Sequence, residues 1–273
     1  MGTVGQVPFA ERLSAAAAGG YVAMSVLPLE TLQDAEEIRR RAADEGVGLS
    51  AVDPLAGWLP DWAPTPHTGR DREAFLRPLA ALDMDRVLGA AAAAGCKDVS
   101  VIEPYGRPVP VDLGSEAFAE VCDRAAAHGL SARLEAMPFS GIPDIGTAWD
   151  IVQRAGRQNG GLVVDTWHLF RGGFRTGLLD EIPVERITLQ LCDAPLVPAS
   201  DLWVESGSRL LPGAGELDLT SVVSTLRRRG FTGPVGPEVV SPALAHLGPH
   251  EAALRAARAC RPLLDHPLPD DEE

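Results

Sequence analysis

The sequence predicts an α/β fold, a single (β/α)8 TIM barrel, over residues 1–264. Three observations indicate this fold. Short β-like runs alternate with longer helical patterns, which is the signature of βαβ units and a parallel sheet. About eight such units fit within the 273 residues of the chain, the size of one closed barrel. No glycine-rich phosphate loop follows the first β-like run, which disfavours an open, doubly wound sheet.

The predicted strands are short β-like runs, and the helical patterns separate them. The strands are expected at Tyr21–Leu27, Val47–Asp53, Asp98–Glu103, Ser131–Met137, Gly161–Trp167, Arg186–Asp193 and Pro234–Val240. One more strand, the first in the chain, has its place around Thr3–Gln6, where the pattern is weakest.

The predicted helices follow from longer periodic patterns with recognisable ends. They are expected at Phe9–Ala18, Glu30–Glu45, Leu82–Ala94, Ser115–His128, Thr147–Ala155, Leu219–Arg229 and Pro249–Leu264. Several of them are followed by a glycine that can end a helix in the left-handed conformation, namely Gly46, Gly95, Gly129, Gly156 and Gly230. Asp144 and Asp218 stand where N-caps are expected.

Two long segments, Pro54–Arg77 and Asp193–Gly215, interrupt the alternation. The first contains Trp58, Trp62 and His67, and the second contains Glu205 and Arg209. Because each segment follows a strand, both are expected over the mouth of the barrel, where long loops usually serve function. Residues 265–273 are expected to form a flexible acidic tail.

Composition and charge exclude several classes of partner. The formal net charge is -14, whereas nucleic acids and anionic membranes recruit basic surfaces, so neither is expected as a partner. No signal peptide is evident, and no segment approaches the roughly 20 apolar residues that span a bilayer, so a cytoplasmic location is expected. The four cysteines contain no CxxC pair, which is typical of small buried hydrophobes.

Polar residues interrupt the last four predicted strands, although strands of a parallel barrel are normally apolar runs. These residues are Glu135, Asp165, Gln190 and Glu238, each in the second half of its strand. Taken singly, each could cap a helix or pair with an arginine. Because neighbouring strands lie about 4.8 Å apart, the four side chains can also converge, and three unpaired carboxylates would then repel one another. One divalent metal ion resolves that conflict, and all-oxygen ligands suit Mn²⁺, Mg²⁺ or Co²⁺.

Four segments of the chain resemble the xylose isomerase-like barrels. They are Leu134-Glu-Ala-Met-Pro-Phe139, Gly161-Leu-Val-Val-Asp-Thr-Trp-His168, Leu189-Gln-Leu-Cys-Asp-Ala-Pro195 and Gly236-Pro-Glu-Val239. That superfamily contains sugar and sugar-phosphate isomerases and epimerases, hydroxypyruvate isomerase, inosose dehydratase and an endonuclease branch. The resemblance implies that the four polar strand residues are the metal ligands. It also implies that His168 contacts a substrate oxygen and that Arg209 binds the substrate.

Two departures from the family pattern leave the substrate open. Gln190 stands where sugar epimerases usually have a histidine, and in this it looks like the bacterial 3-dehydroshikimate dehydratases. The turn that often reads Gly-Glu-Gly in the family is Gly213-Ala214-Gly215 here. The endonuclease branch uses many histidines to bind several metals, whereas this chain has six histidines and a strongly acidic charge, which disfavours DNA repair.

The chemistry implied by the resemblance is proton transfer next to a carbonyl. A metal ion polarises the substrate oxygens, and Glu135 and Glu238 can move protons on opposite faces of a carbon. We therefore expect a metal-dependent isomerase or epimerase of a small polyhydroxylated, sugar or sugar-phosphate-like substrate. A dehydratase of the 3-dehydroshikimate or inosose type is the first alternative, and a non-catalytic metal-binding barrel is the second. The oligomeric state is left open, with a homodimer as one arrangement.

Further residues are expected at the substrate. Trp58, Trp62 and Trp167 can form an apolar wall against a sugar, with ordinary packing as the alternative. Arg171, three residues after His168, can bind a phosphate or carboxylate, and an exposed loop position without such a role is the alternative.

Overall fold

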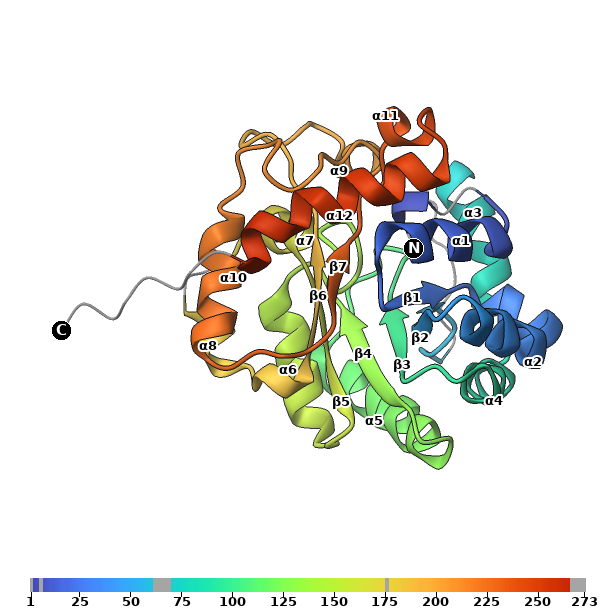
Figure 1. Ribbon diagram of the computed structural model, residues 1–273. Coiled ribbons are helices and arrows are strands. Elements are labelled where there is room, and N and C mark those ends of the chain that lie inside the picture. Colours follow the sequence, from blue (N-terminus) through green and yellow to red (C-terminus); the bar gives the residue numbers. More distant parts are fainter. Residues whose placement is uncertain (1, 5–6, 61–69, 175–176, 266–273) are drawn as a thin grey trace.

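Seven parallel strands form one twisted sheet whose order follows the chain (Figure 1). The computed structural model describes residues 2–4, 7–60, 70–174 and 177–265. Within them the strands are β1 (Ala23–Val26), β2 (Gly48–Leu55), β3 (Asp98–Ile102), β4 (Ser131–Glu135), β5 (Gly160–Asp165), β6 (Ile187–Leu191) and β7 (Val235–Pro237). All neighbouring pairs are parallel, so the carboxyl ends of all the strands lie on one side. That side is where a barrel enzyme carries its site.

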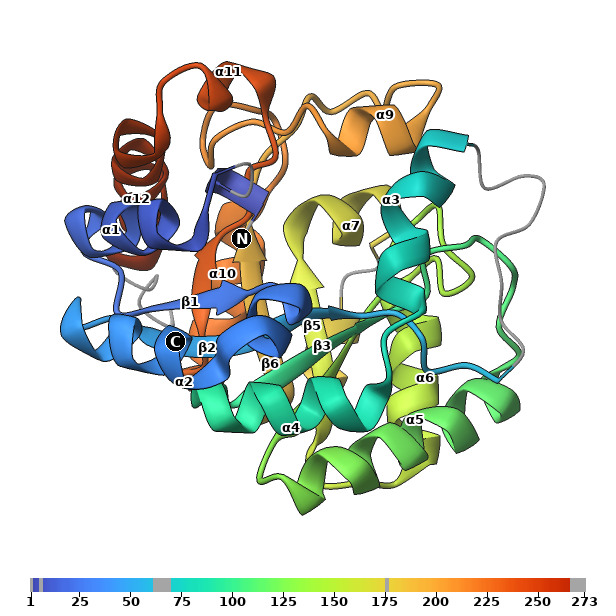
Figure 2. The same ribbon diagram turned by 90° about the vertical axis from the view of Figure 1, so that its right-hand side faces the viewer.

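Helices surround the sheet (Figures 1 and 2). The longer ones are α1 (Phe9–Gly19), α2 (Pro28–Asp44), α3 (Arg70–Ala80), α4 (Met84–Ala94), α5 (Val111–Ala127), α6 (Ile145–Ala155), α10 (Leu219–Arg228) and α12 (Pro249–Asp265). The short ones are α7 (Thr166–Arg171), α8 (Leu178–Glu181), α9 (Leu202–Ser206) and α11 (Pro242–Ala245). Figure 2 shows α7, α9 and α11 on the side of the sheet where β5 ends. No helix within the described ranges is long and apolar enough to cross a membrane.

The predicted glycine ends and aspartate caps of the helices are confirmed. All five predicted C-terminal glycines have positive φ angles, between 67° and 89°, which a glycine adopts without the clash that a Cβ atom would cause. The carboxylate of Asp144 accepts a hydrogen bond from the Thr147 amide, and that of Asp218 accepts one from the Ser221 amide. These contacts satisfy backbone donors that the first turn of a helix leaves unpaired.

The start of the chain differs from the prediction. Residues Gly2–Val4 form a 3-10 helix, η1, and not a strand, while Gly5 and Gln6 lie outside the described residues. The Thr3 hydroxyl donates to the Pro237 carbonyl at 3.3 Å and accepts from the Val239 amide at 3.1 Å. A side-chain hydroxyl, and not a backbone ladder, therefore meets the end of β7. Among the described residues, no ladder joins β1 to β7.

The first long segment also differs from the prediction. The chain forms α3 from Arg70 onwards, inside the predicted loop Pro54–Arg77. The sequence pattern does not predict this helix because five of its eleven residues are charged and Pro78 lies inside it. Trp62, His67 and residues 266–273 lie outside the described residues.

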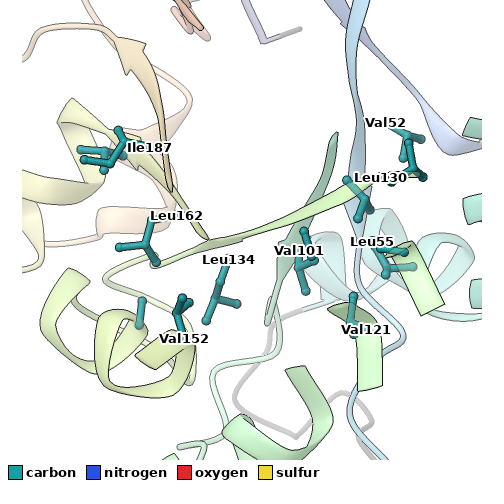
Figure 3. Packing of buried hydrophobic residues seen from close by; sticks show 14 of the residues in the cluster. Val52, Leu55, Val101, Val121, Leu130, Leu134, Val152, Leu162 and Ile187 are labelled. Atoms are coloured by element: carbon teal, nitrogen blue, oxygen red, sulfur yellow. The ribbon is translucent and has the colours of Figure 1, made fainter. Parts of the chain in front are cut away.

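The core lies between the sheet and the surrounding helices (Figure 3). Leu134 and Leu162, on neighbouring strands, and Val121 and Val152, on α5 and α6, have no exposed surface. Burying such a side chain contributes about 1.5–3 kcal/mol. This packing holds the strands in a fixed register, and the register places the polar residues at their carboxyl ends.

Candidate metal centre and active site

Strand register brings the predicted polar residues to the same edge of the sheet. Asp165, the last residue of β5, pairs with Gln190 of β6, and Gln190 pairs with Gly236 of β7. Glu135 is the last residue of β4, and Glu238 follows β7 directly. Four side chains that are distant in the sequence thus lie on adjacent strands at the carboxyl end of the sheet.

Glu135, Asp165 and His168 form a compact, buried cluster. Each offers one potential ligand atom, and these three atoms lie within 4.8 Å of one another. His168 Nε2 is 3.6 Å from Glu135 Oε1. The histidine reaches this position because Asp165 caps the short helix α7: its Oδ1 accepts the His168 amide at 2.9 Å, which folds the chain back over the strand end.

Burial and mutual repulsion shift the protonation of this cluster. Burial, followed by the charges of Glu238, Asp53 and Asp165, raises the pKa of Glu135 well above its usual value. Burial also raises the pKa of Asp165, although Arg209 opposes the shift. Burial and the nearby Arg209 hold the pKa of His168 well below its usual value. The imidazole is therefore neutral near pH 7, and the carboxylates retain protons more strongly than exposed ones.

Arg209 lies inside the cluster. Its Nη1 donates to Asp165 Oδ2 at 2.8 Å and to the Glu238 carbonyl at 3.2 Å. Its Nη2 lies 3.2 Å from His168 Nε2, and the side chain is only 5% exposed. The residue expected to bind substrate thus already contacts three of the predicted site residues, Asp165, Glu238 and His168.

The donor set fits a divalent cation. Glu135 and Asp165 lie in the cluster, and Glu238 is near enough for its charge to raise the pKa of Glu135, while Arg209 supplies a positive charge. The Oε1 atom of Gln190 is buried and has no hydrogen-bond partner among the described residues, although buried amide oxygens are normally paired. An unpaired amide oxygen on the strand position paired with Asp165 suits an oxygen-binding cation. Glu135, Asp165, Gln190 and Glu238 stay the predicted ligands of such an ion.

Asp53 is a site residue that the sequence reasoning missed. It lies on β2 and is only 8% exposed, and no hydrogen bond to its carboxylate is present within the described residues. Burial, followed by the charge of Glu238, raises the pKa of Asp53 to about 7. Asp53 closes an apolar run as Asp165 does, but the same feature is equally typical of a plain strand boundary.

A cavity of about 230 Å³ lies beside the centre, between the two edge strands β1 and β7. Asp53 and Gln190 line it, together with the hydroxyls of Ser50, Ser100 and Thr188. Glu135, Asp165 and His168 are not among its lining residues, so the cavity meets the centre only through Asp53 and Gln190.

The remaining predicted substrate residues are engaged within the protein. Trp58 is buried, its Nε1 donates to the Ile102 carbonyl at 2.8 Å, and its ring packs edge-on against Phe118. Trp167 has no exposed surface and lies under Arg209, whose guanidinium carbon is 5.4 Å from the centre of the indole ring. For both tryptophans the structure favours the packing alternative.

Arg171 is neither an exposed loop arginine nor an open anion site. Its Nε donates to Glu205 Oε1 at 2.7 Å, and its Nη2 donates to the Pro195 carbonyl at 2.6 Å. The side chain is only 4% exposed. Because these donors are occupied, they are not presented to a substrate phosphate or carboxylate.

Comparison with known proteins places this chain among the xylose isomerase-like TIM barrels. A family model described as a xylose isomerase-like TIM barrel matches residues 13–263. The 3-dehydroshikimate dehydratase of Pseudomonas aeruginosa is 28% identical over 235 residues, which are 84% of this chain and 36% of that protein. The inosose isomerase of Halalkalibacterium halodurans is 30% identical over 138 residues, which are 50% of this chain and 48% of that protein. The chain thus spans less than half the length of these two relatives.

Solved structures show the same fold. The IolI protein with a bound zinc atom has a TM-score of 0.78 at 20% identity, and the match covers 93% of this chain and 92% of that one. An L-ribulose 3-epimerase has a TM-score of 0.66 at 16% identity, and the match covers 90% of this chain and 85% of that one. From the extent of the family match and the shared fold, the chain belongs to the xylose isomerase-like TIM barrel family.

Proposed function

We propose that this protein is a divalent-metal-dependent enzyme that moves a proton next to the carbonyl of a small carbocyclic hydroxy-ketone. The observation that carries the proposal is the convergence of Glu135, Asp165 and His168 within 4.8 Å, beside the unpaired oxygen of Gln190. Relatives named for 3-dehydroshikimate and for inosose support the substrate class, because both compounds are carbocyclic hydroxy-ketones.

Dehydration is the proposed outcome of the reaction, and isomerisation is the second candidate. This order reverses the sequence-based expectation for a specific reason. The match to the dehydratase covers 84% of this chain, whereas the match to the inosose isomerase covers 50%. Gln190, which stands where the sugar epimerases usually have a histidine, also favours dehydration over isomerisation. Isomerisation stays in consideration because it shares the first proton transfer with dehydration.

Each side chain of the centre has its own role in the proposed reaction. A bound divalent ion would polarise the substrate oxygens and stabilise the negative charge that develops on them. The carboxylate of Glu135 takes the proton from the carbon next to the carbonyl. Neutral His168 donates to, or accepts from, a substrate oxygen. Glu238 supplies a proton on the opposite side, which for dehydration goes to the departing β-hydroxyl.

Two other features prepare the site for this chemistry. Arg209 presents guanidinium N–H groups to the centre and is the cation that can orient a substrate oxygen. The centre is also largely shielded from solvent, since Glu135, Asp165 and His168 are each no more than 7% exposed. Charged and dipolar groups act more strongly where bulk water is excluded.

The test is to incubate the Mn²⁺-loaded protein with 3-dehydroshikimate, inososes and ketoses in deuterated water. A new conjugated or aromatic absorbance from 3-dehydroshikimate supports dehydration. Deuterium at the carbon next to the carbonyl, without loss of water, supports isomerisation or epimerisation. Neither signal on any compound would favour the non-catalytic metal-binding barrel. A Glu238→Gln variant that is as active as the wild type would contradict the two-glutamate mechanism even if the reaction is found.

A further inference from the structure

The carboxylate of Glu205 is the centre of a hydrogen-bond network beside the proposed site. Its Oε1 accepts from Trp167 Nε1 at 3.1 Å and from Arg171 Nε at 2.7 Å. Its Oε2 accepts from the Ala199 amide at 2.6 Å. The side chain is only 10% exposed and its bonds to Trp167 and Arg171 are partly buried, so water competes only weakly for these two donors.

This network leads directly to Arg209. Glu205 lies in the short helix α9, and the next residue, Ser206, accepts Arg209 Nε through its carbonyl at 3.1 Å. Trp167, oriented by its bond to Glu205, lies under the Arg209 guanidinium at 5.4 Å. The Ser206 carbonyl and the Trp167 ring therefore fix the position of Arg209, and Glu205 holds both of these groups in place.

The network also connects the segment that carries Pro195 and Glu205 to helix α7. Arg171, at the end of α7, bonds to Glu205 and also to the Pro195 carbonyl at 2.6 Å. Helix α7 begins at Asp165, whose Oδ2 accepts Arg209 Nη1 at 2.8 Å. A closed ring of contacts thus runs from Asp165 along α7 to Arg171, across to Glu205, and back through Arg209.

We infer that Glu205 is a positioning residue that fixes the orientation of Arg209 in the centre, with Arg171 as its partner. Its effect on turnover rests on the proposed function, whereas its effect on Arg209 itself does not. A helix of five residues such as α9 is too short to be stable alone, so a tertiary anchor is needed to hold the segment that carries Ser206. Glu205 supplies that anchor because its carboxylate joins α9, the Ala199 segment and α7.

The first test needs no substrate. The Arg209 Nε–H and Trp167 indole N–H resonances are followed by ¹⁵N NMR in the 273-residue chain, assigned with Arg209→Lys and Trp167→Phe. We expect Glu205→Ala to shift both resonances and to speed exchange of the Arg209 Nε proton with water by at least about tenfold. Glu251→Ala is the matched control, because Glu251 pairs with Arg255 at 2.6 Å on the exposed face of α12. Unchanged Arg209 resonances in folded Glu205→Ala would overturn the inference.

The second test is a double-mutant cycle on whichever substrate the wild type converts. We expect Glu205→Ala to lower kcat/KM by about 10- to 100-fold, because small displacements of a substrate-orienting group have effects of that size. Glu205→Gln should retain more activity, since its amide oxygen still accepts from Trp167 or Arg171. In an Arg209→Ala background, Glu205→Ala should change kcat/KM by less than about twofold.

The outcomes separate the two proposals. Additive losses from Glu205→Ala and Arg209→Ala would show that Glu205 acts independently of the arginine and would overturn the inference. If the Arg209 resonances shift as expected but no compound is converted, the positioning role stands and the proposed function fails. Mn²⁺ affinity measured by calorimetry should stay within about threefold in Glu205→Ala, because Glu205 contacts none of the proposed ligands.

Discussion

At the scale of single residues, Asp53 shows how the fold can change an ordinary carboxyl group. Its pKa is raised to about 7 by burial and by Glu238, whereas an aspartate in the unfolded chain has a value near 3.8. Between these two values the folded metal-free protein binds a proton that the unfolded chain releases. The contribution of Asp53 to the free energy of unfolding therefore falls as the pH rises from about 4 to about 7, and then levels off.

The prediction for Asp53 concerns the metal-free protein. Asp53→Asn removes the ionisable group and keeps the shape, so we expect it to raise the free energy of unfolding above pH 7 by up to about 4 kcal/mol. At pH 4 the difference should shrink to under about 1 kcal/mol, because Asp53 is protonated in the folded state and still partly protonated in the unfolded chain. Urea unfolding at pH 4, 6 and 8 measures this. A constant difference across that range would show that Asp53 does not titrate as stated.

Arg209 gives a second prediction at this scale. Arg209→Ala leaves Asp165 buried without its cationic partner, and breaking a buried pair in this way costs about 3–5 kcal/mol. We expect the metal-free variant to have a lower Tm than the wild type, Mn²⁺ to restore much of the difference, and turnover to be strongly reduced. Thermal unfolding with and without Mn²⁺ measures the first two effects. Loss of Mn²⁺ binding together with loss of folding would instead make Arg209 a structural residue.

At the scale of secondary-structure elements, caps and anchors decide where helices begin. The longer helices other than α3 are predictable because periodic apolar residues and glycine ends are local signals. The helices α7 and α9, of six and five residues, carry no such signal and depend on tertiary contacts. Strand β5 ends at Asp165, two residues before its predicted end, because the aspartate caps α7 and starts the helix there.

A test at this scale uses a cap that lies outside the centre. Asp144 caps α6 and accepts hydrogen bonds from both the Thr147 amide and its hydroxyl, each at 2.9 Å. We expect Asp144→Ala to lower the free energy of unfolding by about 1 kcal/mol, because two donors lose their acceptor. Mn²⁺ affinity should be unchanged. Chemical denaturation compared with Asp144→Asn, which can still cap the helix, separates the loss of the cap from the loss of charge.

At the scale of the whole molecule, the proposed centre joins elements far apart in the chain. Its ligands come from β4, β5 and β6 and from the residue after β7, so an ion held there links more than 100 residues of sequence. Binding to the folded state alone stabilises it by about 2.7 kcal/mol at an ion concentration 100 times Kd.

The corresponding prediction combines metal binding with pH. The pKa values of Glu135 and Asp165 are raised, so binding a cation must displace protons, and affinity should fall on acidification. We expect Mn²⁺ to raise the Tm at pH 7.5 and to have little effect near pH 5. Calorimetric titration in two buffers of different ionisation enthalpy would detect the released protons. A Mn²⁺ affinity that is flat over this pH range would contradict carboxylate ligation.

Much of the architecture follows from local pattern. The alternation of strands and helices, the glycine helix ends and the acidic residues closing the last strands can be recognised within a few residues of sequence. Because parallel strands in one sheet align their carboxyl ends, the meeting of Glu135, Asp165 and Gln190 also follows from pattern and topology together.

Other features depend on contacts that local pattern does not encode. The pairing of Arg171 with Glu205 spans 34 residues, and that of Asp165 with Arg209 spans 44. The 3-10 helix at Gly2–Val4 reflects contacts with β7 at the opposite end of the chain. The packing of distant segments decides which polar groups meet and which pKa values are thereby raised or lowered. For that reason tertiary structure, and not sequence pattern, assigned Asp53 to the centre and Arg171 to the network beside it.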